Sequence, residues 1–426
     1  MKVLIKRSKI NGLLTAPSSK SEFHRALICS ALTRGKSVIK YGSLNNDVTV
    51  TINALKKLGV KIKVAKHRLT VDSRLLFRRV TATTVLNCAD SGTSARFLIA
   101  LSSLTDKKIT IDGGAGLRLR PMKALLDALS LQGTQITALH ADNHLPLSVK
   151  GGSLSGGKLI VNSQHTSQYV SALLLISPFA QKEIVLIIKN GRSLPYINLT
   201  KEVMNKFGIS VKKTKNGYSV PSGQKYIPAR FTVSGDYSQA AFLFAAAALT
   251  GGRVTVKNLD KNSSQGDKYF LDILKQMGCL ITVKNNRITL ENNSSLKGIS
   301  LDMGNYPDLV PPLTVLAGNC RGVIKIRNIG HLKDKESDRL ETLSLNLKKM
   351  GITVKKYSNR LTVFPGILTG ALISSFNDHR IAMSFAVAAL HAKGSSVINN
   401  AVVVNKSYPG FWKDLQKVGT KISYIN

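Results

Sequence analysis

Several short segments of this chain combine basic residues with Ser, Thr, Asp or Asn directly before a strongly apolar stretch. They contain Lys20, Arg25, Arg96 and Arg380. Ser, Thr, Asp and Asn commonly cap helices at the N-terminus, and capping alone explains any single segment well. The free N–H groups and the dipole of a helix N-terminus also bind anions. Because cations recur in these segments, we expect a site for phosphate or carboxylate groups.

A second set of polar residues follows predicted strands, on loops that share one position in a repeat described below. These loops are Arg118–Pro121, Ser193–Tyr196, Lys333–Arg339 and Asn405–Pro409. Lys335 and Arg339 are four residues apart, so both would face one way on a helix with Glu336 beside them. A solvated charged surface is the alternative, but the position shared with Arg120 and Lys406 favours a site.

The net charge of +38 arises from 61 basic and only 23 acidic residues. Nucleic-acid binding and an anionic substrate both fit such a balance. The basic residues are spread along the whole chain, and aromatic residues, which stack on bases, make up only 6%. We therefore favour a compositional origin for the charge. Since acids are scarce, the positions that retain them are informative: Asp308, Glu336, Asp338 and Asp378.

A pattern ending in glycine recurs six times and indicates which elements position these residues. An apolar residue, two mostly polar residues and a second apolar residue precede each glycine, except that Gln132 takes the second apolar position of the second copy. The glycines are Gly59, Gly133, Gly208, Gly278, Gly351 and Gly419. Their near-equal spacing indicates one supersecondary unit used six times. Each glycine is typical of a helix C-cap, and two short strands joined by a polar turn follow it, which predicts a helix and a β-hairpin.

A strongly apolar run followed by a β-branched strand precedes each of these amphipathic helices. Runs that are apolar on most faces predict buried helices. The runs are Ala26–Leu32, Phe97–Leu104, Leu173–Ile176, Ala240–Leu249, Leu309–Ala317 and Ile381–Leu390. After the sixth glycine only one strand, Lys421–Ile425, remains, and Met1–Ile5 forms another strand without a partner. We expect these two terminal strands to pair and complete the sixth unit.

The length of 426 residues suggests two or three domains, and six units of helices and strands divide naturally into two sets of three. No apolar run reaches the roughly 18 residues that a membrane span needs, and the first apolar stretch is too short for a signal peptide. The four cysteines are scattered, which argues against zinc and favours buried thiols. We therefore expect a cytoplasmic protein.

The polar motifs, taken in order along the whole chain, resemble those of the 5-enolpyruvylshikimate-3-phosphate synthases (3-phosphoshikimate 1-carboxyvinyltransferases). Any one motif is weak, but the ordered set is highly specific. The matching segments are Ser19–Ser21 with Arg25–Leu27, Ser91–Thr93 with Arg96, Arg120-Pro121, Ser167-Gln168, Pro195-Tyr196, Gly235-Asp236, Pro307-Asp308, Lys335–Arg339, Asn377–Arg380 and Asn405–Pro409.

The resemblance implies a fold, the two-domain inverse α/β barrel. Residues 1–20 and 236–426 would form the first domain, closed by both chain termini. Residues 21–235 would form an inserted second domain, joined to the first by a double crossover. The site would lie in a cleft that closes on the substrates and excludes water.

The resemblance also implies the activity, which is transfer of the enolpyruvyl group of phosphoenolpyruvate to the 5-hydroxyl of shikimate 3-phosphate in the shikimate pathway to chorismate and aromatic amino acids. The implied catalytic residues are Asp308 as the base at the 5-hydroxyl, Glu336 as the group that exchanges the proton at the methylene carbon, and Lys20. The residues implied on the phosphoenolpyruvate side are Lys20, Gly92, Arg120, Gln168, Arg339, Arg380 and Lys406. Those implied on the shikimate 3-phosphate side are Lys20, Ser21, Arg25, Thr166, Ser167, Gln168, Ser193, Tyr196, Asp308, His331 and Lys335. No metal or organic cofactor is implied, and we expect a monomer whose partners are its two small-molecule substrates, with no nucleic acid or membrane.

Four positions depart from the family pattern. Ser18 replaces the usual Gly, Thr166 replaces Ser, and both Asp90 and His331 stand where Asn is usual. Asp90 would place a carboxylate beside the phosphoenolpyruvate site, so we expect activity with an altered KM for that substrate. Three alternatives remain: the sister enzyme that acts on UDP-N-acetylglucosamine, whose loop cysteine is missing from Gly113–Arg118; an RNA-binding protein; and an inactive descendant.

Overall fold

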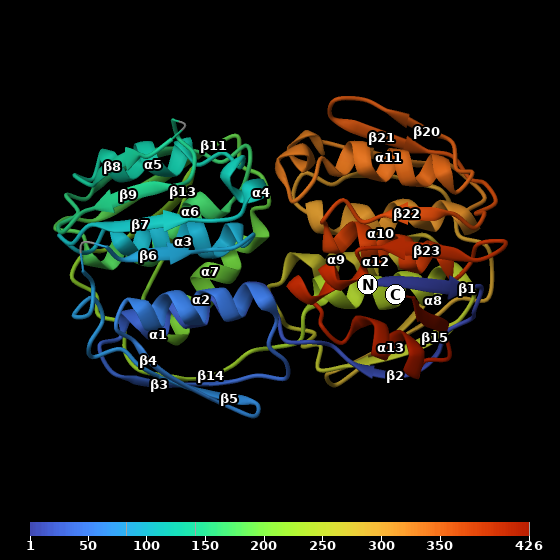
Figure 1. Ribbon diagram of the computed structural model, residues 1–426, viewed down its shortest axis with the longest axis horizontal. Helices are drawn as coiled ribbons and strands as arrows, with labels where there is room; N and C mark the ends of the chain where they lie inside the picture. Colours follow the sequence, from blue (N-terminus) through green and yellow to red (C-terminus); the bar gives the residue numbers. More distant parts are fainter. Residues whose placement is uncertain (82, 141, 426) are drawn as a thin grey trace. The chain divides into compact units, whose positions relative to one another are not determined.

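The computed structural model describes residues 1–81, 83–140 and 142–425 (Figure 1). The chain divides into two compact units: unit 1 comprises Met1–Ser19 and Ser234–Asn426, and unit 2 comprises Lys20–Val233. Each unit has its own core of buried hydrophobic residues. The two units are therefore described separately.

Each unit contains three four-stranded sheets among its described residues. The sheets of unit 2 have the orders β14-β3-β5-β4, β6-β7-β9-β8 and β10-β11-β13-β12, and those of unit 1 have the orders β16-β17-β15-β2, β18-β19-β21-β20 and β22-β23-β1-β24. The strands of unit 2 are β3 (Lys36–Lys40), β4 (Lys61–Ala65), β5 (Arg68–Asp72), β6 (Val85–Asn87), β7 (Ile109–Asp112), β8 (Gln135–Ala138), β9 (Leu147–Lys150), β10 (Gly157–Asn162), β11 (Ile184–Lys189), β12 (Lys212–Thr214), β13 (Gly217–Val220) and β14 (Arg230–Thr232). The strands of unit 1 are β1 (Lys2–Lys6), β2 (Asn11–Thr15), β15 (Arg253–Lys257), β16 (Leu280–Lys284), β17 (Arg287–Glu291), β18 (Ile299–Asp302), β19 (Ile324–Arg327), β20 (Val354–Lys356), β21 (Arg360–Val363), β22 (Leu372–Ser374), β23 (Ser396–Asn399) and β24 (Lys421–Ile425).

Helices alternate with these strands along the chain. In unit 2 they are α1 (Lys20–Leu32), α2 (Asn46–Lys57), α3 (Gly92–Ser102), α4 (Ala115–Arg118), α5 (Lys123–Ser130), α6 (Gln168–Ile176), the 3-10 helix η1 (Ser177–Phe179) and α7 (Pro195–Lys206). In unit 1 they are α8 (Tyr237–Thr250), η2 (Gly266–Lys268), α9 (Tyr269–Gln276), η3 (Pro307–Leu309), α10 (Val310–Thr314), η4 (Val315–Asn319), η5 (Gly330–Asp334), α11 (Arg339–Lys349), α12 (His379–Ala389), η6 (Ala401–Lys406) and α13 (Phe411–Lys417). In the described part of the chain, no helix has both the length and the apolar character needed to cross a membrane.

The sixfold repeat predicted from the glycines is confirmed. All six glycines follow an outer helix with φ between 82° and 107°, the left-handed region that costs glycine little. In every sheet a strand pairs in parallel with a second strand, and this second strand pairs antiparallel with the last strand of the hairpin. The strand that opens each sheet was missed by the sequence analysis. β6 and β14 have three residues each, which is too short to show a periodicity.

The two chain termini complete the last sheet of unit 1, as predicted. Strand β1 pairs antiparallel with β24, from Lys2 opposite Ile425 to Lys6 opposite Lys421. Figure 1 shows the N and C labels side by side at this sheet. β1 thus takes the place that the final hairpin strand occupies in the other five sheets.

The chain passes between the two units twice, once after β2 and once after β14, and this is the double crossover. β2 precedes α1 of unit 2 in sequence but pairs in parallel with β15 of unit 1. β14 precedes α8 of unit 1 but pairs in parallel with β3 of unit 2. The segments that follow these two strands bind one another through an isolated bridge between Ser18 and Gly235.

The buried helices form the centre of each unit. In unit 2, α1, α3 and α6 are buried along almost their whole length, and α8 and α12 are equally buried in unit 1. The prediction of one helix over Leu309–Ala317 is wrong, because the chain there divides into η3, α10 and η4. Pro311 and Pro312 lack the N–H groups that a continuous helix requires.

Candidate active site

The caps of the buried helices place the candidate residues at one end of each helix. The side chains of Ser91, Asp236 and Asp378 accept hydrogen bonds from the backbone N–H groups of α3, α8 and α12, which confirms the predicted capping. Ser167 precedes α6 without a side-chain capping bond. Asp308 lies inside η3 and therefore does not act as a helix cap.

Arg339 of unit 1 binds three carboxylates at once. Its Nη1 atom donates to Asp308 Oδ1 at 2.9 Å, and its Nη2 atom donates to Glu336 Oε2 at 2.9 Å. Its Nε atom donates to Asp378 Oδ2 at 2.7 Å. The side chains of Arg339 and Asp378 are 1% and 0% exposed, whereas Asp308 and Glu336 remain 23% and 13% exposed. The buried carboxylate of Asp378 thus fixes the guanidinium of Arg339. The carboxylates of Asp308 and Glu336, which are the expected acid/base groups, stay accessible to solvent.

Two more cations complete this cluster. The Nη2 atom of Arg380 lies 2.9 Å from Asp308 Oδ2. The Nζ atom of Lys406, at the end of η6, lies 3.3 Å from Glu336 Oε1. Burial opposes ionisation of Asp308, but the charges of Arg380, Arg339 and Lys335 outweigh it and hold the pKa of this carboxyl well below its usual value. Asp308 is consequently a carboxylate at neutral pH.

The predicted helix that carries both Lys335 and Arg339 is wrong. Helix α11 begins at Arg339, with Asp338 as its N-cap, and Lys335 has an extended backbone before it. Asp338 is a strong N-cap, and it starts the helix too late for Lys335 to share a helical face with Arg339. The structure still places Lys335 near Asp308, whose pKa its charge lowers.

Unit 2 contributes a second group of candidate residues around Gly92. The Nη1 atom of Arg96 donates to Gln168 Oε1 at 2.7 Å, and Gln168 Nε2 donates to Thr93 Oγ1 at 3.0 Å. A Cβ atom on Gly92 would lie 2.8 Å from Arg96 Nη1 and 2.9 Å from Arg120 Nη1. A side chain at position 92 would therefore displace these guanidinium groups from this helix end.

Lys20 opens α1 and forms an ion pair that the sequence analysis missed. Its Nζ atom lies 3.1 Å from Asp47 Oδ2, and the two side chains are 15% and 8% exposed. Asp47 lies in the first turn of α2. The scarcity of acids was the available signal, because Asp47 is one of the few carboxylates retained in this half of the chain.

Arg25, one turn further along α1, is buried and binds the protein itself. Its guanidinium donates to Thr200 Oγ1 (2.7 Å), Ser21 O (2.8 Å), Tyr196 O (3.0 Å) and Ser171 Oγ (3.3 Å). Burial lowers its pKa to about 10. Arg25 thus ties α1 to α6 and α7, close to the other residues implied on the shikimate 3-phosphate side.

Those other residues lie at the starts of α6 and α7. Thr166 and Ser167 are buried next to Gln168, whose N–H donates to Thr166 Oγ1 at 3.2 Å. Ser193 is buried with φ of 56°, just before α7. The structure therefore gathers the unit 2 residues at the N-terminal ends of α1, α3, α6 and α7.

A buried series of side-chain hydrogen bonds, also missed by the sequence analysis, begins at His24, one turn after Lys20 in α1. His24 Nδ1 lies 2.8 Å from Thr51 Oγ1, which lies 2.7 Å from Ser94 Oγ. These hydrogen bonds link α1, α2 and α3. Burial lowers the pKa of His24 to about 3, so the imidazole is neutral at physiological pH.

Comparison with known proteins decides the family. A family model described as EPSP synthase (3-phosphoshikimate 1-carboxyvinyltransferase) matches residues 4–415. Relatives named 3-phosphoshikimate 1-carboxyvinyltransferase include one from Methanocorpusculum labreanum, 38% identical over 421 residues that cover 98% of this chain and 99% of the relative. Another, from Methanosarcina mazei, is 37% identical over 432 residues that cover 100% and 99%. This chain belongs to the EPSP synthase family.

The fold of the EPSP synthase family accounts for the architecture described above. The structure of EPSP synthase from Acinetobacter baumannii has a TM-score of 0.83 and 27% sequence identity to this chain, and the match covers 99% of this chain and 100% of that one. The predicted inverse α/β barrel with six repeated units is thereby confirmed.

The four departures from the usual EPSP synthase pattern fit the structure in different ways. Ser18 is buried at the bridge to Gly235, and His331 is buried in η5. Thr166 keeps the hydroxyl that a Ser would supply. Asp90 is exposed, and a Cβ atom on Gly114 would lie 2.6 Å from its Oδ1 atom, so this carboxylate rests against the loop before Arg120.

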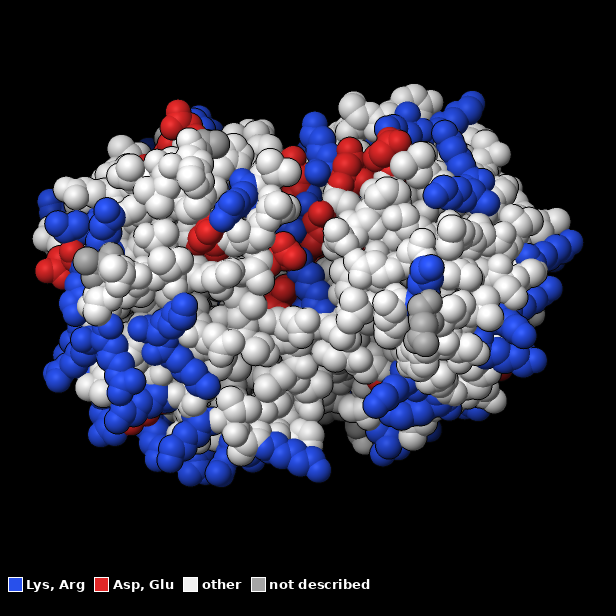
Figure 2. Space-filling view, in the orientation of Figure 1, with Lys and Arg blue, Asp and Glu red and all other residues white. Residues whose placement is uncertain are grey.

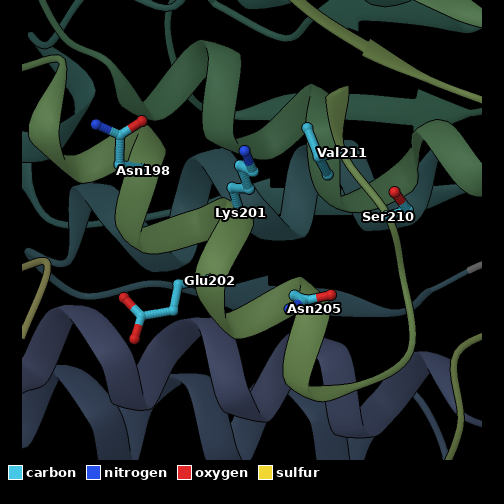
Figure 3. A pocket seen from close by; sticks show the side chains of 6 residues that line it. All are labelled: Asn198, Lys201, Glu202, Asn205, Ser210 and Val211. Atoms are coloured by element: carbon cyan, nitrogen blue, oxygen red, sulfur yellow. The ribbon is translucent and has the colours of Figure 1, made fainter. Parts of the chain in front are cut away.

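Other features of this EPSP synthase family member lie outside these two groups. In the described ranges, no group of three or more His, Cys, Asp or Glu side chains is arranged to hold a metal ion. An open cavity of about 530 Å³ runs along α7 in unit 2, with Asn198, Lys201 and Glu202 on its lining (Figure 3). On the face shown in Figure 2, Lys and Arg side chains occur in several separate groups on each unit. This scatter agrees with a compositional origin of the charge.

Proposed function

We propose that this chain transfers the enolpyruvyl group of phosphoenolpyruvate to the 5-hydroxyl of shikimate 3-phosphate and releases inorganic phosphate. The observation that carries this proposal is the full-length match to relatives named 3-phosphoshikimate 1-carboxyvinyltransferase. The reaction belongs to the shikimate pathway, which leads to chorismate and the aromatic amino acids. The ionic cluster of unit 1 supplies groups of the kind that this chemistry requires.

The reaction proceeds by addition and elimination. The methylene carbon of phosphoenolpyruvate gains a proton while the 5-hydroxyl oxygen attacks C2, which gives a tetrahedral intermediate. Loss of a proton from the new methyl group and of phosphate from C2 then forms the enol ether. Protons and electrons balance without a metal or an organic cofactor, but the sequence needs an acid/base group at each reacting centre.

Glu336 and Asp308 are the proposed acid/base groups. Glu336 exchanges the proton at the methylene carbon, and Asp308 accepts the proton of the 5-hydroxyl. In the structure Asp308 is held ionised by Arg380 and Arg339. Anionic phosphoenolpyruvate would compete for these cations, so its binding weakens their hold on Asp308 and raises the basicity of this carboxylate.

The remaining cations are proposed to bind the two anionic substrates. Arg120, Arg339 and Arg380 carry guanidinium forks that suit the carboxylate and phosphate of phosphoenolpyruvate. The proposed contacts on that side also include Lys20, Gly92, Gln168 and Lys406. Gly92 supports this role because its missing side chain leaves room beside Arg120.

The shikimate 3-phosphate subsite is proposed at the helix starts of unit 2, with three residues from unit 1. Its members are Lys20, Ser21, Arg25, Thr166, Ser167, Gln168, Ser193, Tyr196, Asp308, His331 and Lys335. Arg25 contributes by fixing the backbone of Ser21 and Tyr196. We further propose a monomer that acts in the cytoplasm on these two small molecules, because neither step needs a protein partner.

Phosphate release tests this function. With phosphoenolpyruvate and shikimate 3-phosphate we expect saturable release, and with UDP-N-acetylglucosamine or no acceptor we expect none. Glu336→Gln removes the proton-exchanging group and lowers kcat at least about 100-fold. The matched control is Glu341→Gln, since Glu341 is 42% exposed and pairs with Lys356. Absence of release with shikimate 3-phosphate, or equal release with UDP-N-acetylglucosamine, would contradict the proposal.

A further inference from the structure

A second cavity in unit 2 lies at the carboxyl-terminal ends of the buried helices. It has a volume of about 490 Å³ and is lined by Leu32 at the end of α1, Leu104 just after α3 and Phe179 at the end of η1. The candidate substrate residues lie at the opposite ends of the same helices. Since α1 has 13 residues, Lys20 lies about 18 Å from Leu32 along this helix.

The inner wall of this cavity is apolar. Leu76, Phe77, Leu104 and Phe179 line it, and all four pack against the core of unit 2 while remaining only partly buried. Two of the four are aromatic rings. An apolar group bound in the cavity would remove the apolar surface of these side chains from water, which is favourable.

The outer rim of the cavity is cationic. Arg34, Arg74 and Arg78 line it and are exposed. Arg74 pairs with Asp72, with 2.6 Å between Nη2 and Oδ2. Within residues 1–81, 83–140 and 142–425, the guanidinium groups of Arg34 and Arg78 make no hydrogen bond or ion pair. Two guanidinium forks are therefore available to a ligand.

The loop that carries Phe77 is held in a strained shape. Phe77 has φ of 65°, a conformation that is costly for a bulky residue. Its N–H donates to Leu58 O at 2.6 Å, and the Nζ atom of Lys107 donates to the carbonyl oxygens of Phe77 and Val80. These bonds hold the loop that carries Phe77 in a defined position, as a preformed binding site requires.

Basic residues at the carboxyl-terminal ends of helices also have a simpler explanation, because their charge stabilises the negative end of the helix dipole without any ligand. Unit 1 shows this simpler arrangement at the ends of α8 and α12, where Arg7 and Lys9 line a cavity of about 260 Å³. Its other lining residues are Ser8, Thr250, Leu390 and His391, so a single large apolar side chain lines it. The aromatic wall under unpaired arginines distinguishes the cavity of unit 2.

We propose that the cavity of unit 2 binds a small aromatic carboxylate. The ring packs against Phe77, Leu104 and Phe179, and the carboxylate binds the guanidinium groups of Arg34 and Arg78. Planar carboxylates and guanidinium groups match in bidentate geometry, and the volume suits a ligand of this size. This site is separate from the proposed reaction and does not depend on it.

Calorimetric titration tests the proposal with three probes at constant ionic strength. 3-Phenylpropanoate has both the ring and the carboxylate, 3-phenylpropan-1-ol has the ring alone, and acetate has the carboxylate alone. We expect saturable one-to-one binding of 3-phenylpropanoate, at least about tenfold tighter than that of either other probe, since a charge-assisted hydrogen bond contributes that much. Equal binding of the acid and the alcohol would overturn the proposal, as would no saturable binding of the acid.

Variants locate the bound acid. R34Q/R78Q should weaken 3-phenylpropanoate binding at least about tenfold. R79Q makes the same change on the same loop at an exposed arginine outside the cavity lining, and should leave the affinity within about twofold. Unchanged affinity in R34Q/R78Q, or an equal loss in R79Q, would show that the acid binds elsewhere and would overturn the assignment.

Discussion

The substitution Asp378→Asn probes how the ionic cluster of unit 1 is held in place. The Oδ1 atom of Asp378 accepts from Arg339 Nη2 at 3.2 Å and from the N–H of Arg380 at 2.9 Å. Its Oδ2 atom accepts from Arg339 Nε at 2.7 Å and from Ser337 Oγ at 3.2 Å. Both oxygens face donors of Arg339, so either orientation of an asparagine amide places an NH2 group against that guanidinium.

The cost follows from the burial of this pair. Removing one partner of a buried ion pair costs about 3–5 kcal/mol, and the lower end applies because Asp308 and Glu336 still neutralise Arg339. About 3 kcal/mol lowers the melting temperature of a unit of this size by about 6–12 °C. Trp412, the single tryptophan of the chain, is buried in unit 1, so its fluorescence follows the unfolding of this unit.

The matched control for this experiment is Asp338→Asn. Asp338 also caps a helix, α11, but it is exposed and its capping oxygen accepts from the N–H of Glu341. Because Asn and Asp cap helices about equally well, the melting temperature should fall by less than about 2 °C. If Asp378→Asn lowers the melting temperature no more than this control does, the reasoning about the buried Arg339 pair is wrong.

Two further predictions concern unit 2. Asp90→Asn should lower the KM for phosphoenolpyruvate by about fivefold in steady-state assays, since a charge at contact distance in water contributes about 1 kcal/mol; an unchanged KM would count against a role for Asp90. The pKa of His24 is about 3 in the fold against 6.5 in the unfolded chain, so only the unfolded chain gains a proton as pH falls from 6.5 towards 3, and stability is lost in that range. In urea unfolding monitored by circular dichroism, the free energy of unfolding of the wild type should fall by about 3 kcal/mol more than that of His24→Asn between pH 7 and pH 4. Equal decreases in the two proteins would refute His24 as the origin of this pH dependence.

The repeat made much of the fold predictable from the sequence. Each C-capping glycine marks a place where the chain needs a left-handed residue, and this local requirement is visible without any tertiary information. The pairing of the terminal strands was predictable because the sequence of the last unit contains only one strand after its glycine, where the other five units contain two. The opening strands β6 and β14 could not be predicted, because three residues are too few to show a period and their pairing is set by distant partners.

The candidate site was less predictable than the fold. Motifs indicated which residues gather, but pairings such as Lys20 with Asp47 depend on how α1 packs against α2. The expected helix over Lys335–Arg339 failed because the N-cap Asp338 fixes the start of α11. Arg25 shows a further limit, since residue type alone does not reveal that the fold uses its donors internally.

The central claim, addition and elimination with Glu336 as the proton-exchanging group, is tested most directly by the reaction in deuterium oxide. Phosphoenolpyruvate and shikimate 3-phosphate are incubated with the enzyme, and the product is examined by mass spectrometry and NMR. We expect a carboxyvinyl ether of shikimate 3-phosphate with deuterium in its vinyl group, because the transient methyl group can lose any one of its three hydrogens. We also expect Glu336→Gln to form this product at least about 100-fold more slowly. A product free of deuterium, or an unchanged rate in Glu336→Gln, would contradict it.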